Sequence, residues 1–182
     1  MPFADRVRLR YVGRGWYEST APTNYVWRDG VIDRVITIPA GTRSDLASTP
    51  RIMWWFIPPT GAYEDAAFVH DEGCVELRRA YDEGRAPQMT SREVDALFLD
   101  VLREADRHAC ETEDPEGRIP GWKRRLLWVG VRWGALANPA RRAGWWRDAP
   151  AVLAITAPLL ALVVGALLAV HALVDAALGA LM

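Results

Sequence analysis

The stretch AVLAITAPLLALVVGALLAV (residues 151–170) decides the architecture of this chain, because it contains no charged residue. A bilayer core about 30 Å thick requires roughly 20 apolar helical residues, and this stretch supplies them. Trp145, Trp146 and Arg147 precede it and suit the headgroup layer. We therefore predict a C-terminal transmembrane helix. A very apolar helix buried in an oligomer or a particle is the alternative.

The charges of the chain are concentrated before this stretch. All 22 Lys and Arg residues and 22 of the 23 Asp and Glu residues precede Ala149, and the segment from Arg118 to Asp148 holds Lys123 and seven arginines against one acid. We expect this basic segment to face anionic lipid, at roughly 1 kcal/mol per basic group near the surface, and the globular part to be cytoplasmic. Specific nucleic-acid binding is disfavoured, because the part before Ala149 is formally neutral and has no reading motif.

The chain has room for one globular domain. The part before the apolar stretch has about 148 residues, enough for one core but hardly for two. We predict a globular domain over residues 1–137, a basic and Trp-rich linker over 138–149 and a transmembrane helix over 150–182. Two cysteines, Cys74 and Cys110, do not make a disulfide framework and are expected to be reduced thiols.

The N-terminal third has the pattern of β-strands. Segments rich in β-branched and aromatic residues are separated by turn signals, at residues 6–12, 16–17, 25–27 and 34–38. They predict a small antiparallel β-meander. A polar loop over residues 44–50 then predicts a helix start at about Arg51, followed by a short apolar turn from Ile52 to Ile57.

Three helices are predicted after the strands. Apolar spacing indicates helices over residues 62–79 and from Thr90-Ser91, where Glu93 allows a capping box, and the short loop between them predicts an antiparallel pair. A third helix is predicted over residues 121–136, with an apolar stripe expected to pack in the core: Trp122, Leu126, Val129, Trp133 and Leu136. The fold class is therefore α+β, a β-meander packed on an antiparallel helical bundle and followed by a transmembrane helix.

The candidate site is centred on His70 and Asp71. Adjacent helical residues point about 100° apart, so at least one of this pair needs a polar partner. In an antiparallel helix pair Asp95 falls near the level of His70, where it could hold one imidazole nitrogen and leave the other as a base. Asp71 could then bind a hard cation such as calcium. The alternative is a His70–Asp95 hydrogen bond that merely fixes two helices.

Other site chemistries fit less well. Cys74, one turn after His70, permits a Cys–His dyad or half of a zinc site, but no second pair of soft ligands is visible, and a small buried thiol is the simpler interpretation. An HD-type phosphohydrolase needs an earlier histidine, and His70 is the first in the chain. Phosphate-binding loops, a nucleophile elbow and zinc-protease motifs are absent from the sequence.

Several short motifs occur in a characteristic order: Asp45-x-Ala47-Ser48-x-Pro50, Gly61-x-Tyr63, His70-Asp71, Ser91-Arg92-x-x-Asp95 and Val131-Arg132-x-Gly134. Over about Asp45 to Ala135 the chain resembles a family of uncharacterised phage and prophage proteins, domain of unknown function thirteen fifty-three. The resemblance implies a phage or prophage origin and no established activity. The family usually has Leu-Tyr soon after His-Asp, where this chain has Glu72, Gly73 and Cys74, and it is usually met without a membrane tail.

Secreted phospholipases A2 are similar in one respect, a His-Asp pair on one helix with the His oriented by an Asp on an antiparallel partner. That similarity implies that His70 activates water, Asp95 orients it and Asp71 binds calcium. The cysteine of that motif comes one residue late here, and the disulfide ladder is missing. A calcium loop is represented at best by residues 60–63.

Two functional hypotheses follow. In the first, the chain is a non-enzymatic, membrane-anchored phage or prophage protein, a virion component or an accessory factor in lysis, exclusion or assembly. His70 and Asp95 then form a structural clamp, and Asp45 with Ser48 makes a polar turn before Pro50. In the second, it hydrolyses lipid or other esters with His70, Asp71 and Asp95. Expected partners are the bilayer, other phage proteins or a second copy through the tail, where His171 and Asp175 could pair within one helix or between helices.

Overall fold

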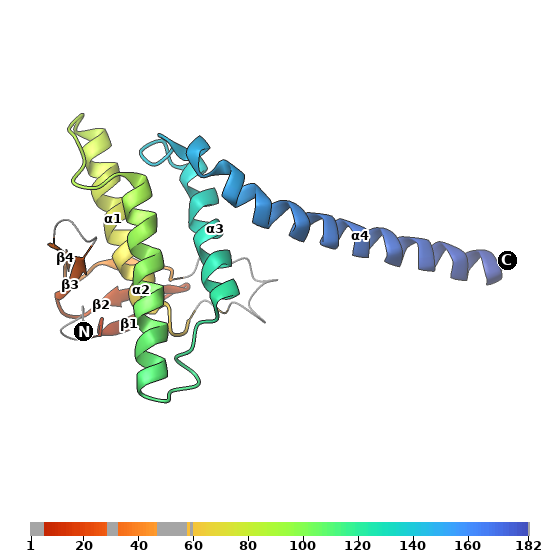
Figure 1. The fold of residues 1–182 in the computed structure, drawn as a ribbon, viewed down its shortest axis with the longest axis horizontal. Helices are drawn as coiled ribbons and strands as arrows, with labels where there is room; N and C mark the ends of the chain where they lie inside the picture. The colour runs from red at the N-terminus through yellow and green to blue at the C-terminus, as the bar shows by residue number, and fades with distance from the viewer. Residues whose placement is uncertain (1–5, 29–32, 47–57, 59, 182) are drawn as a thin grey trace. The chain divides into compact units, whose positions relative to one another are not determined.

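The computed structural model describes residues 6–28, 33–46, 58 and 60–181 (Figure 1). Ser48, the helix start predicted near Arg51 and the apolar turn predicted from Ile52 to Ile57 lie outside these residues. The chain forms two compact units, Met1–Ala143 and Gly144–Met182. The first contains the strands and three helices, and the second contains one long helix.

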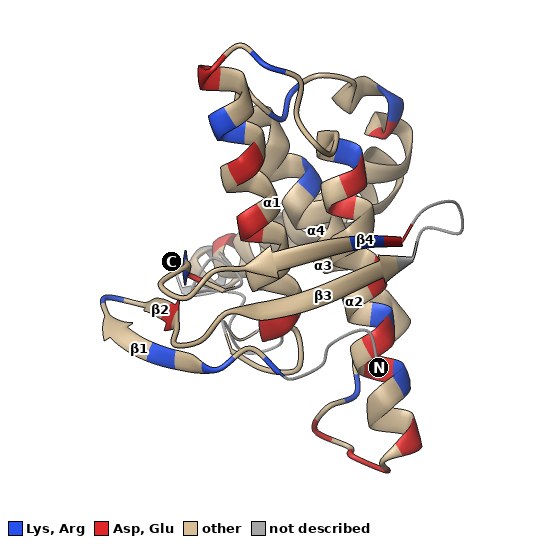
Figure 2. Cartoon of the chain, turned by 90° about the vertical axis from the view of Figure 1, so that its left-hand side faces the viewer, with Lys and Arg blue, Asp and Glu red and all other residues tan. Residues whose placement is uncertain are grey.

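The strands pair antiparallel, as predicted, but they divide into two sheets. Strands β1 (Leu9–Gly13), β2 (Trp16–Ser19) and β5 (Arg43–Ser44) form one sheet in the order β1-β2-β5. Strands β3 (Thr23–Arg28) and β4 (Asp33–Ile38) form a separate hairpin, which lies across the helices in Figure 2.

Buried Ser19 explains why β2 pairs with β5 and not with β3. Its hydroxyl donates to the carbonyl of Pro39 at 2.6 Å and accepts from the amide of Thr42 at 3.1 Å, while its backbone bonds to Gly41 and Thr42. These bonds bring the chain after β4 back to the free edge of β2. The simple meander expected from strand order is thereby interrupted.

The predicted antiparallel helix pair is present. Helix α1 (Glu64–Asp82) and helix α2 (Ser91–Glu111) pack side by side (Figure 1). The capping box at the start of α2 is complete, since the Thr90 hydroxyl accepts from the Glu93 amide and the Glu93 carboxylate accepts from the Thr90 amide. The helices approach closely at Gly73, where an added Cβ would lie 2.8 Å from a methyl carbon of Val94.

The core lies where α1 and α2 meet the strands. Its fully buried apolar side chains come from both layers: Ile38 from β4, Phe68 and Val69 from α1, and Val94, Leu97, Val101 and Leu102 from α2. Polar ties reinforce the contact between layers. Asp65 accepts from the backbone amide of Val7 at 3.1 Å, and the Trp27 indole donates to Asp100 at 3.2 Å. The core therefore holds the N-terminal strands and the first two helices as one body.

Helix α3 (Gly121–Ala137) occupies the predicted segment, but the apolar stripe expected to pack in the core is only partly buried. Val129 is buried, whereas Trp122 is 55% exposed and Trp133 is 39% exposed. The buried face of α3 includes Arg132, which forms an ion pair with Asp95. This polar contact turns α3 so that the two tryptophans of the stripe lie at the surface.

The second unit contains a short 3₁₀ turn, η2 (Trp145–Arg147), and helix α4 (Ala149–Leu181). The part of α4 from Ala149 to Leu178 is long and apolar enough to cross a membrane, and it is the only such helix in the described part of the chain. Near its end, His171 Nε2 lies 3.4 Å from Asp175 Oδ2 within the same helix.

Candidate functional site

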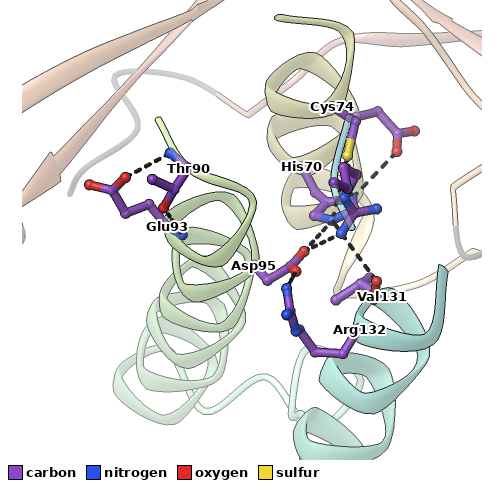
Figure 3. A network of polar contacts seen from close by, with 9 residues as sticks. His70, Cys74, Thr90, Glu93, Asp95, Val131 and Arg132 are labelled. Carbon is purple, nitrogen blue, oxygen red and sulfur yellow. Dashed lines mark hydrogen bonds and ion pairs between the residues drawn. The ribbon is translucent and has the colours of Figure 1, made fainter. Parts of the chain in front are cut away.

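The site is a buried polar network around Asp95, which is fully excluded from solvent (Figure 3). One carboxylate oxygen, Oδ1, lies 2.9 Å from His70 Nε2 and 2.5 Å from Arg141 Nη2. The other, Oδ2, accepts from Arg132 Nη1 at 2.5 Å. The network therefore joins α1, α2, α3 and the segment that follows α3.

Local structure positions each member of the network. The edge of the Phe98 ring packs against the His70 imidazole, with ring centroids 5.3 Å apart. Asn138 starts a turn in which its side chain accepts from the Ala140 amide and its carbonyl accepts from the Arg141 amide. That turn directs Arg141 back toward α3, where Nη2 also donates to the carbonyl of Val131 at 3.1 Å.

The surroundings of Asp95 determine the hydrogen-bond direction at His70. Arg132 and Arg141 each donate a hydrogen bond to a different oxygen of the carboxylate, so both oxygens act as acceptors. Nε2 of His70 must therefore carry a proton and donate it. The other ring nitrogen, Nδ1, lies 3.6 Å from Asp71 Oδ1. The sequence predicted that Asp95 holds one ring nitrogen and leaves the other free as a base, whereas in the structure the other nitrogen lies close to Asp71.

The pKa of His70 is raised well above its ordinary value of 6.5. Burial opposes the charged imidazolium, but the electrostatic interaction with Cys74 and the hydrogen bonds to Asp71 and Asp95 outweigh it. The protonated form of His70 is therefore favoured inside the folded domain. A histidine that holds its proton this way strengthens the contact with Asp95, but it is a poor base at neutral pH.

Cys74 lies beside His70 but not in the position of a hydrogen-bonded nucleophile. Its sulfur is almost equally far from both ring nitrogens, 3.7 Å from Nε2 and 3.8 Å from Nδ1. Equal distances place the sulfur away from the in-plane lone-pair direction of either nitrogen. The sulfur is therefore as close to the imidazole as a Cys–His dyad requires, but it is not oriented for a hydrogen bond to either nitrogen.

An open groove of about 630 Å³ lies next to the network. Its lining includes Asp45, Asp71 and Cys74 together with three cations, Arg43, Arg78 and Arg79. His70 and Asp95 do not line it. The residues selected from the sequence are therefore divided, because Asp45 and Asp71 face a groove whereas His70 and Asp95 lie in a sealed interior.

The donor set for calcium is incomplete in the described part of the chain. Among those residues, no three side chains of His, Cys, Asp or Glu are grouped as metal ligands would be. The loop compared with a calcium loop is bonded to itself, since the Gly61 amide donates to Glu64 and the Tyr63 hydroxyl donates to the carbonyl of Thr60.

The sequence matches a known protein family. A family model described as "Protein of unknown function (DUF1353)" matches residues 20–113, which is more than half of the chain. The chain belongs to the DUF1353 family. No curated protein and no solved structure matches it. The matched region of this DUF1353 protein contains His70, Asp71 and Asp95, whereas Arg132 and Arg141 lie beyond it.

Sequence reasoning missed both arginines of the network. Arg132 belongs to the motif Val131-Arg132-x-Gly134 and lies one turn from buried Val129 and Ala135, which was an available signal. Arg141 had no such signal, because it is one of several arginines in a basic segment. The expectation that this segment faces lipid is wrong for these two residues, since both are buried against Asp95.

Two further arginines of the basic segment form ion pairs within the first unit. Arg118 Nε donates to Asp106 at 2.9 Å, and Arg124 also pairs with Asp106. The Asp106 carboxylate accepts from the backbone amide of Ile119 as well. Burial opposes ionisation of Asp106, but these hydrogen bonds hold its pKa below the ordinary value. This cluster fixes the loop between α2 and α3.

Proposed function

We propose that this DUF1353 protein is a membrane-anchored, non-enzymatic component of a phage or prophage, a virion protein or an accessory factor in lysis, exclusion or assembly. The observation that carries the proposal is α4, a helix of 33 residues whose apolar side chains are exposed to solvent over most of its length. Exposed leucines and valines in such number need an apolar surrounding, and a bilayer supplies one. The phage association is supported by the family resemblance.

The buried network supports a structural role for His70. His70 is 6% exposed, Asp95 is fully buried, and the carboxylate already forms ion pairs with two arginines. A catalytic base must reach a proton of the substrate, which a sealed histidine does not do. In this proposal the network holds together the three helices of the first unit and the segment that leads to the anchor.

The anchor is tested by extracting membranes that contain the full chain with alkaline carbonate. Wild type should stay with the membrane, whereas the variant Leu160→Arg with Val164→Arg should be released, because each arginine near the middle of a span costs about 2.5–3.5 kcal/mol. Val35→Arg is the matched control, since Val35 is 64% exposed on β4, and it should behave as wild type. Wild type that is fully released would contradict the proposal.

A second function, hydrolysis of lipid or other esters, is favoured by one observation. Nδ1 of His70 faces Asp71, and Asp71 lines the groove, so a small opening of the groove would expose a ring nitrogen that Asp95 already orients. The test compares phospholipid hydrolysis by wild type and His70→Gln, in calcium and in chelator. Hydrolysis by wild type that His70→Gln abolishes, in a variant that is still folded, would favour the enzyme over the structural clamp.

A further inference from the structure

Helix α3 presents an apolar face to solvent. This outer face consists of residues spaced so that they fall on one side of the helix: Trp122, Leu126, Gly130, Trp133 and Ala137. Both tryptophans are exposed, as are Gly130 and Ala137, while Leu126 is half-buried. A cluster of exposed apolar side chains that includes two tryptophans is typical of an interaction surface.

The charge of α3 identifies the kind of surface that fits. The helix contains one lysine and three arginines and no acidic residue. Arg124 and Arg132 are used in ion pairs, which leaves Lys123 and Arg125 on either side of the outer face. Arg125 is exposed, and Lys123 is half-buried with Nζ 5.3 Å from the centre of the Tyr63 ring. Tryptophans flanked by cations match the headgroup layer of an anionic bilayer.

The sequence keeps α3 close to the anchor. Residues 138–148 separate the end of α3 from the start of α4, and even fully extended they span at most about 40 Å. A bilayer that holds α4 is therefore always within reach of α3. Such tethering raises the effective lipid concentration at the outer face, so that weak contacts suffice.

We propose that the outer face of α3 is a second membrane contact, which lies on an anionic lipid surface. The inference rests on the proposed anchoring by α4. Trp122 and Trp133 enter the interfacial layer, and Lys123 and Arg125 contact lipid phosphates or carboxylates. The globular unit is then held against the membrane by this face in addition to its tether.

The test uses the full chain in lipid nanodiscs whose acyl chains carry bromine, a short-range quencher of tryptophan fluorescence. The discs contain either phosphatidylcholine alone or a mixture with phosphatidylglycerol. In the mixed discs, Trp122→Ala with Trp133→Ala should remove part of the quenched fluorescence. Trp16→Ala should not, because Trp16 is an exposed tryptophan on β2, outside α3. Arg125→Glu should lower the quenching of the α3 tryptophans in mixed discs only.

The outcomes separate this inference from the anchor. If the discs retain the chain but Trp122 and Trp133 are not quenched, the lipid contact is overturned and the anchor stands. If alkaline carbonate releases the chain while the two tryptophans still show salt-sensitive quenching on anionic vesicles, the anchor is overturned and the contact stands. Unquenched tryptophans together with a dimer that the double variant dissociates would assign the outer face to a second copy instead.

Discussion

At the scale of single residues, Asp95 is the most constrained side chain of the domain. It receives hydrogen bonds from His70, Arg132 and Arg141, and all four side chains are at least nine-tenths buried. Removing each ion from water costs several kcal/mol. The attraction between the ions offsets this cost only when every member of the network keeps its partners. The network is therefore better evidence for a specific arrangement of helices than for high stability.

Substituting Asp95 by Asn should be strongly destabilising. The change keeps the shape of the side chain but leaves two buried guanidinium groups without a carboxylate, and we expect a loss of about 3–5 kcal/mol in the free energy of unfolding. Thermal and chemical denaturation of the full chain in detergent would measure it. Glu111→Gln removes an acid from the same helix at a 58% exposed position, and it should change the stability by less than about 0.5 kcal/mol.

His70 should make stability depend on pH in a defined direction. Its pKa is raised in the folded state, so its contribution is complete below the ordinary value of 6.5 and is lost as pH rises through the folded pKa. As pH rises from the ordinary value of 6.5 through the folded pKa, the free energy of unfolding of wild type should therefore fall relative to that of His70→Gln. Gly134→Ala, which removes no titratable group and whose Cβ meets nothing within 4 Å, serves as the control and should keep the slope of wild type. A constant difference between wild type and His70→Gln would contradict the raised pKa.

The sequence was sufficient to pair His70 with Asp95 but not to complete the network. The pairing follows from two antiparallel helices joined by a short loop, which brings the two residues to one level. Arg132 was marked only by its motif and its spacing from Val129 and Ala135, and Arg141 by no local pattern. A long cationic side chain carries no periodic signal that reveals what it reaches. The exposure of Trp122 was missed for the same reason, since the orientation of α3 depends on Arg132.

At the scale of elements, the helices were predictable and the division of the sheet was not. Helical spacing of apolar residues fixes local structure in α1, α2 and α3, and the capping box at Thr90 and Glu93 marks the start of α2. Strand β5 has only two residues, too few for a pattern, and its pairing with β2 depends on the long-range bonds of Ser19. Local signals thus determined the helices, whereas tertiary contacts determined the sheet.

The close approach of α1 and α2 makes Gly73 sensitive to substitution. Gly73→Ala places a Cβ 2.8 Å from a methyl carbon of Val94, which is fully buried and stiff, and should cost about 1–3 kcal/mol. In a double-mutant cycle, Gly73→Ala should cost less in the background Val94→Ala. Gly134→Ala on α3 is the matched control, since its Cβ meets nothing within 4 Å, and it should stabilise by up to about 1 kcal/mol. Equal costs in both backgrounds would show that the clash is relieved elsewhere.

At the scale of the whole molecule, the two units differ in the surroundings they need. The first unit has its own core and polar network, whereas the second is a single apolar helix that follows a short turn. The division after Ala143 assigns Arg141 to the first unit. The globular domain predicted from the sequence ended at residue 137 and would omit this arginine.

Two truncated chains test where the globular domain ends. A chain of residues 1–143 should dissolve without detergent and keep the melting temperature of the first unit. A chain of residues 1–137 lacks Arg141 and should melt several degrees lower, because Asp95 loses a buried partner. Arg141→Ala in the longer chain should reproduce most of that loss. Equal melting temperatures for both truncated chains would place the boundary before Asn138.

The order of the network along the chain has a consequence for biosynthesis. Asp95 leaves the ribosome 46 residues ahead of Arg141, a delay of about 2–9 s at translation rates of 5–20 residues per second. During that interval the Asp95 carboxylate, in the hairpin of α1 and α2, lacks at least one of the two arginines that pair with it. Arg141 is added just before translation of the apolar helix α4 begins, so completion of the buried network and synthesis of α4 become nearly simultaneous events.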